Sequence, residues 1–114
     1  MKGARWSELL QSAGGTGELE RASQGTAEHP VCGDRVQLSV RHSGGVIHEL
    51  RWRASACPAT TAVAALAAKV LANVPIAGAP AALRTAIAAH GGLEPHERHA
   101  EAVVLKALAA ATGS

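Results

Sequence analysis

Apolar and polar residues alternate along two neighbouring stretches in the middle of the chain. In the first stretch Val36, Leu38 and Val40 alternate with polar residues, which is typical of a half-buried β-strand. In the second, one face of the expected strand carries Val46, His48, Leu50, Trp52 and Ala54. Residues 43–45, Ser-Gly-Gly, lie between the stretches and suit a tight turn. The pattern therefore predicts an antiparallel hairpin with Trp52 in the core.

The spacing becomes helical beyond Cys57. Val63, Leu66, Val70 and Val74 recur at intervals of three and four residues, which predicts a helix of about four turns beginning at Pro58. Further helices are expected over residues 80–89 and from residue 95 onward. The apolar stripe of the last helix is Ala100, Val103, Val104, Ala107, Leu108 and Ala111.

Two weaker elements are expected before the hairpin: a short amphipathic helix over residues 5–13 and a brief edge strand around residues 19–22. Strands followed by a run of helices indicate an α+β fold. We expect a small antiparallel sheet of two to three strands with helices packed on one face, as a single domain over residues 1–114.

Composition narrows the function classes. Hydrophobic residues make up 47% of the 114 residues, but Phe and Tyr are absent, so small side chains must pack the core and helices must approach closely. A net charge of +2 without a basic run does not indicate a nucleic-acid partner. Two cysteines cannot form the disulfide framework of a secreted module. Neither a signal peptide nor a membrane span is predicted, and we expect a cytoplasmic protein.

Candidate metal ligands lie at the expected ends of strands and helices. Residues 32–34, Cys-Gly-Asp, precede the first strand of the hairpin, and Cys57 lies where the second strand meets a helix. His99 lies in the first turns of the last helix. Together Cys32, Asp34, Cys57 and His99 could hold a tetrahedral zinc ion or an iron–sulfur cluster.

Spacing alone leaves alternatives to this ligand set open. The two cysteines could be buried structural thiols, since free cysteine is among the most buried residue types. His96 lies three residues before His99 and could share a metal with it or be solvated. His29, His42 and His48 are expected to be strand or loop residues. No nucleophile–base pair or phosphate loop is evident, so we expect a binding protein and not an enzyme.

At these residues the sequence resembles the iron–sulfur cluster assembly scaffold family of IscU, SufU and the NifU N-terminal domain. Residues 29–34, His-Pro-Val-Cys-Gly-Asp, resemble the family's first motif, and residues 53–62 around Cys57 resemble its second. Residues 93–100 fall where IscU-type members carry Leu-Pro-Pro-Val-Lys-x-His-Cys. The resemblance implies iron, cluster or zinc binding through Cys32, Asp34, Cys57 and His99, and a cysteine desulfurase as the sulfur-donating partner.

The sequence also departs from the family pattern. Ala100 stands where the family has its third cysteine, a cluster ligand and sulfur acceptor. Of the segment by which IscU-type members engage an Hsp70-type chaperone, only Leu93 and Pro95 remain, so the resemblance gives little support to that partner. Two interpretations follow: a scaffold-like protein that binds a cluster or metal, or a divergent paralogue, zinc-binding or metal-free, that acts as a regulatory or interaction module.

Overall fold

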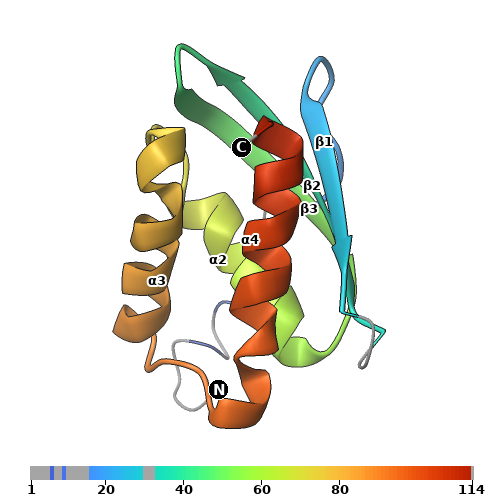
Figure 1. The fold of residues 1–114 in the computed structure, drawn as a ribbon, viewed down its shortest axis with the longest axis vertical. Coiled ribbons are helices and arrows are strands. Elements are labelled where there is room, and N and C mark those ends of the chain that lie inside the picture. The colour runs from blue at the N-terminus through green and yellow to red at the C-terminus, as the bar shows by residue number, and fades with distance from the viewer. Residues whose placement is uncertain (1–5, 7–8, 10–15, 30–32, 114) are drawn as a thin grey trace.

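A three-stranded antiparallel sheet and three α-helices make up the part of the chain that the computed structural model describes, namely Trp6, Leu9 and residues 16–29 and 33–113 (Figure 1). The sheet order is β1 (Ser23–Glu28), β2 (Arg35–Ser43) and β3 (Val46–Ser55). The helices are α2 (Pro58–Val70), α3 (Ala79–Ala89) and α4 (His99–Thr112), with single 3-10 turns η1 (Ile76–Gly78) and η2 (Pro95–Glu97). The expected α+β fold is confirmed.

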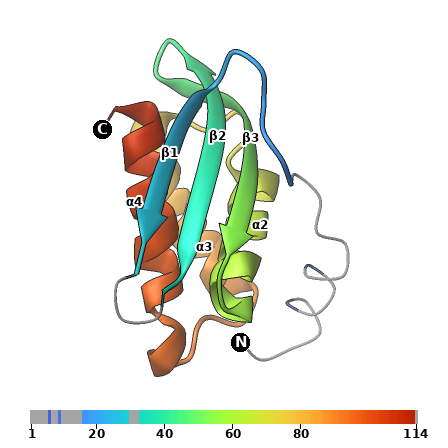
Figure 2. The same cartoon turned by 90° about the vertical axis from the view of Figure 1, so that its right-hand side faces the viewer.

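The helices cover one face of the sheet (Figure 2). Helix α4 packs on β1 and β2, α2 packs mainly on β3, and α3 packs on α2. The alternating residues Val36, Leu38 and Val40 of β2 are fully buried beneath this helical layer, and Trp52 of β3 is 5% exposed. The whole apolar stripe expected on the last helix is buried as well. The core therefore lies between the sheet and the helices, as the two hydrophobic periods predict.

Small residues allow β1 and α4 to approach closely. Gly25 of β1 lies directly against the backbone of α4, so that a Cβ atom added there would overlap the carbonyl oxygen of Ala107 and the amide nitrogen of Ala111. Both of these alanines are buried. The abundance of alanine in this chain, and its lack of Phe and Tyr, fit such close packing.

The edge strand lies later in the chain than expected. Residues 19–22 form a turn, in which Arg21 has a φ of 55°, and the strand itself is Ser23–Glu28. Its sequence offers little local signal for a strand, because it contains a glycine and no alternating large apolar residues. Close packing on α4 and pairing with β2 determine its place.

The inward face of β3 changes at a β-bulge. Arg41 pairs with Glu49 while His42 pairs with Ile47, which leaves His48 as an extra residue on β3. Ile47 is therefore fully buried and His48 is exposed, where its Nε2 lies 2.6 Å from the Ser43 hydroxyl oxygen. The prediction that His48 lies on the apolar face was wrong, because simple alternation cannot anticipate a bulge.

The end of α2 and the start of α4 differ from the expectation, and most of the helix expected over residues 5–13 lies outside the described residues. Helix α2 ends at Val70, so Val74 follows the helix and accepts a hydrogen bond from the Ile47 amide at 2.9 Å. The last helix begins at His99, after the separate turn η2. Trp6 and Leu9 of the helix expected over residues 5–13 are buried, and the rest of that segment lies outside the described residues. Among described helices, none has the length and apolar character needed to span a membrane.

Candidate metal centre

Three of the four expected ligands meet at one end of the molecule. Asp34 directly precedes β2, Cys57 connects β3 to α2, and His99 is the first residue of α4. These chain segments share the lower end of the view in Figure 2. One carboxylate oxygen of Asp34, the Cys57 sulfur and one His99 ring nitrogen all lie within 4.8 Å of one another.

Asp34 is the centre of this cluster, which we call the Asp34 cluster (Asp34, Cys57, Thr60 and His99). Its Oδ2 accepts a hydrogen bond from the Thr60 hydroxyl at 2.7 Å and lies 3.0 Å from His99 Nε2 and 3.3 Å from the Cys57 sulfur. Its Oδ1 accepts a hydrogen bond from the Cys57 backbone N–H at 3.0 Å. The side chain thus ties the start of β2 to the first turns of α2 and α4.

The surroundings of Asp34 favour its ionised form. The residue is 3% exposed, and this burial opposes ionisation. Hydrogen bonds from the Thr60 hydroxyl, the Cys57 N–H and thiol, and His99 outweigh burial and lower the pKa of Asp34 below its ordinary value. A carboxylate that is charged at neutral pH can act as a metal ligand without first losing a proton.

Cys57 takes its position from the start of α2. It is the N-cap residue, with extended backbone angles (φ −64°, ψ 160°), and Pro58 follows at the first helical position. The residue is half-buried, and its sulfur lies 3.6 Å from His99 Nε2. Cys57 supplies no side-chain cap to its own helix, and its N–H donates to Asp34 in another part of the chain.

The loop that leads into Asp34 is closed by backbone hydrogen bonds. The Gly33 amide donates to the His29 carbonyl oxygen at 2.8 Å, and the His29 amide donates to the Asp34 carbonyl oxygen at 2.8 Å. Gly33 has a φ of 71°, a left-handed conformation that glycine adopts without strain. Cys32, the fourth expected ligand, lies outside the described residues.

The remaining histidines differ in their relation to the Asp34 cluster. His96 is exposed and is not part of the cluster, and His42 lies in β2 as expected. His29 follows β1, and its ring centroid lies 4.9 Å from that of His99 with the two planes inclined by 50°. Sequence reasoning placed His29 in a strand or loop and missed this proximity. Its position three residues before Cys32, inside the first motif, was the available signal.

Sequence reasoning also missed Thr60. This threonine is completely buried and donates the shortest hydrogen bond that Asp34 receives among the described contacts. It lies three residues after Cys57, on the first turn of α2. That spacing was the available signal, since residues three apart on a helix lie on the same side.

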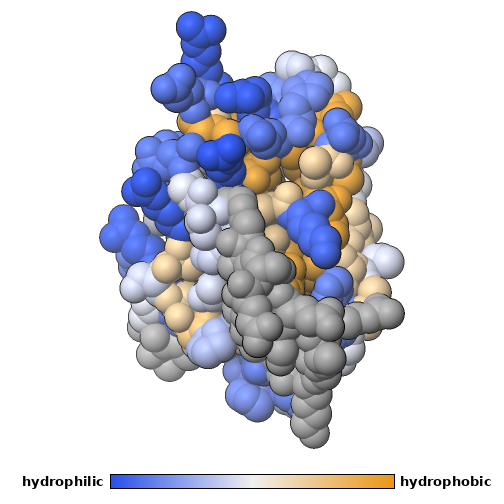
Figure 3. Space-filling view, turned by 180° about the vertical axis from the view of Figure 1, so that it is seen from behind, coloured by the Kyte–Doolittle hydropathy of each residue, from blue (hydrophilic) through white to orange (hydrophobic). Residues whose placement is uncertain are grey.

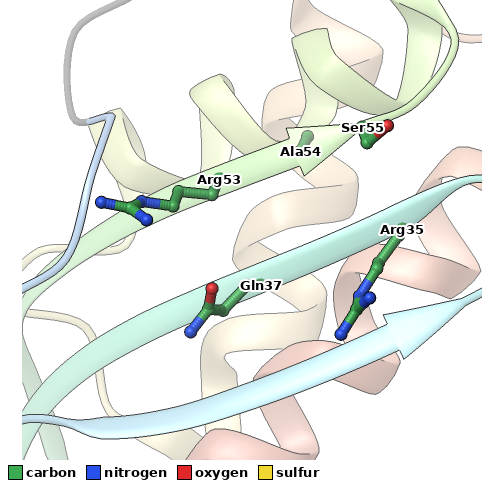
Figure 4. A pocket seen from close by; sticks show the side chains of 5 residues that line it. All are labelled: Arg35, Gln37, Arg53, Ala54 and Ser55. Carbon is green, nitrogen blue, oxygen red and sulfur yellow. The ribbon is translucent and has the colours of Figure 1, made fainter.

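A shallow recess of about 230 Å³ lies over β2 and β3 (Figure 4). Seen from behind, the molecule shows polar side chains beside apolar patches (Figure 3). The recess is lined by Arg35, Gln37, Arg53, Ala54 and Ser55. Its arginines already have acidic neighbours, because Arg35 lies 3.5 Å from Glu28 and Arg53 lies 3.5 Å from Glu18. The Asp34 cluster, with three different donor atoms around one point, is the stronger candidate for a functional site.

Comparison with known proteins shows which fold and which family this chain shares. Two crystal structures share the fold: a candidate iron–sulfur cluster assembly scaffold protein for the SUF system from Fervidobacterium islandicum, and the N-terminal part of a NifU-like protein from Brucella abortus. The first has a TM-score of 0.78 at 14% identity, covering 96% of this chain and 95% of its own. The second has a TM-score of 0.65 at 19% identity, covering 93% of this chain and 76% of its own. No curated protein sequence matches the chain.

The family model described as "NifU-like N terminal domain" matches residues 10–114. The match includes both cysteine motifs and all of β1 to α4, so it covers the elements that build the Asp34 cluster. The resemblance inferred from residues 29–34 and 53–62 is thereby confirmed, and this chain belongs to the family of NifU-like N-terminal domains.

Proposed function

We propose that this protein is an iron–sulfur cluster assembly scaffold-like protein that binds iron, a cluster or zinc through Cys32, Asp34, Cys57 and His99. The observation that carries the proposal is the convergence of Asp34, Cys57 and His99 at the meeting point of β2, α2 and α4. Family membership supports it, as does the fold shared with a structure described as a candidate iron–sulfur cluster assembly scaffold.

The three described donors suit a tetrahedral metal ion in chemistry and in spacing. Zinc binds oxygen and nitrogen at ~2.0–2.2 Å and sulfur at ~2.3 Å, so its ligand atoms lie roughly 3.3–3.6 Å apart in a tetrahedral site. The corresponding separations here are 3.0 Å for oxygen to nitrogen, 3.3 Å for oxygen to sulfur and 3.6 Å for nitrogen to sulfur. The donors could therefore surround an ion with shifts of a few tenths of an ångström.

Each residue of the cluster has a role in this proposal. Asp34, Cys57 and His99 bind the cargo directly, and Cys32 completes the set. Thr60 does not bind the metal itself. Its hydrogen bond to the Asp34 carboxylate orients that ligand. The activity is binding and transfer of a metal or cluster, without turnover of an organic substrate, and a cysteine desulfurase is the proposed source of sulfur.

One observation favours a second candidate function. Ala100, next to His99, is completely buried, and its methyl group can neither bind a metal nor accept sulfur. A chain lacking this thiol could use the same fold as a zinc-binding or metal-free regulatory or interaction module. A zinc-binding measurement distinguishes the scaffold from a metal-free module. A cluster assembly measurement distinguishes the scaffold from a zinc-binding module.

We expect the protein to bind one zinc ion per chain, and His99→Ala to weaken that binding far more than His96→Ala. The His99 side chain is 16% exposed and lies against Asp34 and Cys57, whereas His96 is exposed and outside the cluster. Loss of a ligand should lower the zinc affinity by at least about 10–100-fold, because losing a residue that only hydrogen-bonds to a ligand already has an effect of that size. Competition with a chromophoric zinc chelator measures this directly.

The same titration should show zinc release as the solution is acidified, because protons compete with zinc for the imidazole and for the thiolates. Equal losses from His99→Ala and His96→Ala would mean that His99 is not a ligand. Absence of zinc binding by the native chain would favour the metal-free interaction module.

A further inference from the structure

The two carboxylate oxygens of Asp34 have different partners. Oδ1 accepts the Cys57 backbone N–H, and among the described contacts it meets neither the Cys57 sulfur nor His99. Oδ2 accepts the Thr60 hydroxyl and also lies 3.3 Å from the Cys57 sulfur and 3.0 Å from His99 Nε2. Oδ2 is therefore the oxygen that faces the other two donor atoms of the proposed site.

Both contacts that orient the carboxylate come from the start of α2. Thr60 is completely buried on the first turn of that helix, and Cys57 is its N-cap residue. Asp34 itself is 3% exposed, so water has little access to replace either donor. Turning the carboxylate away from this orientation would leave the Thr60 hydroxyl and the Cys57 N–H without their acceptor, which costs free energy at a buried position.

The contacts at Oδ2 differ in whether a metal ion could replace them. A carboxylate oxygen has two lone pairs. The Thr60 hydroxyl, at 2.7 Å, occupies one of them, and the Cys57 sulfur and His99 Nε2 lie near the remaining position. These last two atoms are ligands in the proposed site, so an ion between them would replace their contacts with Oδ2 and leave the Thr60 hydrogen bond in place.

We propose that Thr60 is a positioning residue which, together with the Cys57 N–H, makes Asp34 a ligand through Oδ2 alone. The inference rests on the proposed metal site and adds the atom by which Asp34 binds. It also bears on the choice of ion. An aspartate that gives one oxygen contributes a single donor, as suits a four-coordinate ion such as zinc, whereas calcium takes more ligands and can use both oxygens of a carboxylate.

Thr60→Val tests the hydroxyl with little change in side-chain volume. We expect the zinc affinity, measured by chelator competition, to fall at least about tenfold, because losing a residue that hydrogen-bonds to a ligand has an effect of that size. Thr60→Ser keeps the hydroxyl donor and should bind zinc within about threefold of the native chain. Thr61→Val is the matched control, since it makes the same change at the next residue of α2, outside the cluster. Circular dichroism of the metal-free variants verifies that each is folded.

Infrared spectroscopy reports on this carboxylate directly, because Asp34 is the only aspartate of the chain. Cell-free synthesis with aspartate that carries carbon-13 in its side-chain carboxyl therefore labels one group. A carboxylate bound to a metal through one oxygen has widely separated symmetric and antisymmetric stretching bands, and one bound through both has closely spaced bands. We expect zinc to widen the separation in the native chain and in Thr60→Ser, and to widen it less in Thr60→Val. The Thr60 oxygen also lies 3.5 Å from the Cys57 sulfur, and an effect through that contact alone would not move these bands.

Several results would overturn the role of Thr60: an unchanged zinc affinity in Thr60→Val, carboxylate bands in that variant identical to the native ones, or a loss in Thr60→Ser as large as that in Thr60→Val. If Thr60→Val does not fold, closely spaced bands in the native chain or a tenfold loss of affinity in Thr60→Ser would still do so. If His99→Ala loses zinc in any of these cases, the proposed metal site stands and only Thr60 is rejected. Failure of the native chain to bind zinc would overturn both.

Discussion

Gly25→Ala should destabilise the protein by about 3 kcal/mol or more, at the upper end of the range for overpacked cores. The added methyl group would overlap the carbonyl oxygen of Ala107 and the amide nitrogen of Ala111, and it would lie 2.9 Å from the carbonyl carbon of Ala110. All three are backbone atoms of α4, so no side-chain rotation can relieve the overlap. Either β1 or α4 must shift, and both pack on the core. Urea unfolding followed by circular dichroism measures the loss.

Gly78→Ala is the matched control for this substitution. Gly78 has a φ of −95°, which any residue adopts, and a Cβ added there meets no atom within 4 Å. We expect a change within about 1 kcal/mol, and a gain if the alanine reduces the entropy of the unfolded chain. Equal unfolding midpoints for the two variants would contradict the close approach of β1 to α4.

Asp34→Ala should cost about 2–4 kcal/mol in metal-free protein, because it leaves several buried donors without their acceptor. The Thr60 hydroxyl and the Cys57 N–H both donate to this carboxylate, so the start of α2 would lose both contacts. Glu28→Ala is the control, since Glu28 forms an exposed ion pair with Arg35 that should contribute at most about 1 kcal/mol. Urea unfolding in the presence of a chelator measures both variants.

The effect of Asp34 should also depend on pH in a defined direction. The folded protein lowers the pKa of this carboxyl below its ordinary value of 3.8, so the stabilisation is fully present above that value. It is lost as the pH falls below 3.8 and through the lowered pKa of the folded state. The difference in stability between the native protein and Asp34→Ala should therefore shrink in acid. A constant difference from pH 7 to pH 3 would show that the Asp34 charge does not contribute.

Local sequence patterns could predict the hairpin, the helices and the chain positions of the candidate ligands. Alternation identified the buried face of β2, and helical spacing identified the buried stripe of α4, because each pattern reflects burial of one face of one element. The convergence of Asp34, Cys57 and His99 was expected because strand ends and helix starts gather at the edges of a layered fold.

Features that depend on contacts between distant segments escaped prediction. The bulge at His48 and the late start of β1 depend on strand pairing and on the fit of Gly25 against α4. Thr60 contacts Asp34, 26 positions away, and the His29 ring lies beside that of His99, 70 positions away; no local pattern encodes either contact. The sequence shows that these polar side chains are present, but only the folded structure shows that they lie close together.

Anaerobic cluster reconstitution tests the scaffold function most directly, with a cysteine desulfurase, L-cysteine and iron(II), followed by visible absorption and by iron and sulfide analysis. The native chain should form little cluster, and Ala100→Cys should form several times more, because it adds a thiol next to His99 at the start of α4. Ala102→Cys is the control, since it adds a thiol at an exposed position of the same helix. Equal rate and yield in the native chain and Ala100→Cys would contradict the role assigned to the missing thiol. Absence of cluster from both would contradict the scaffold function itself.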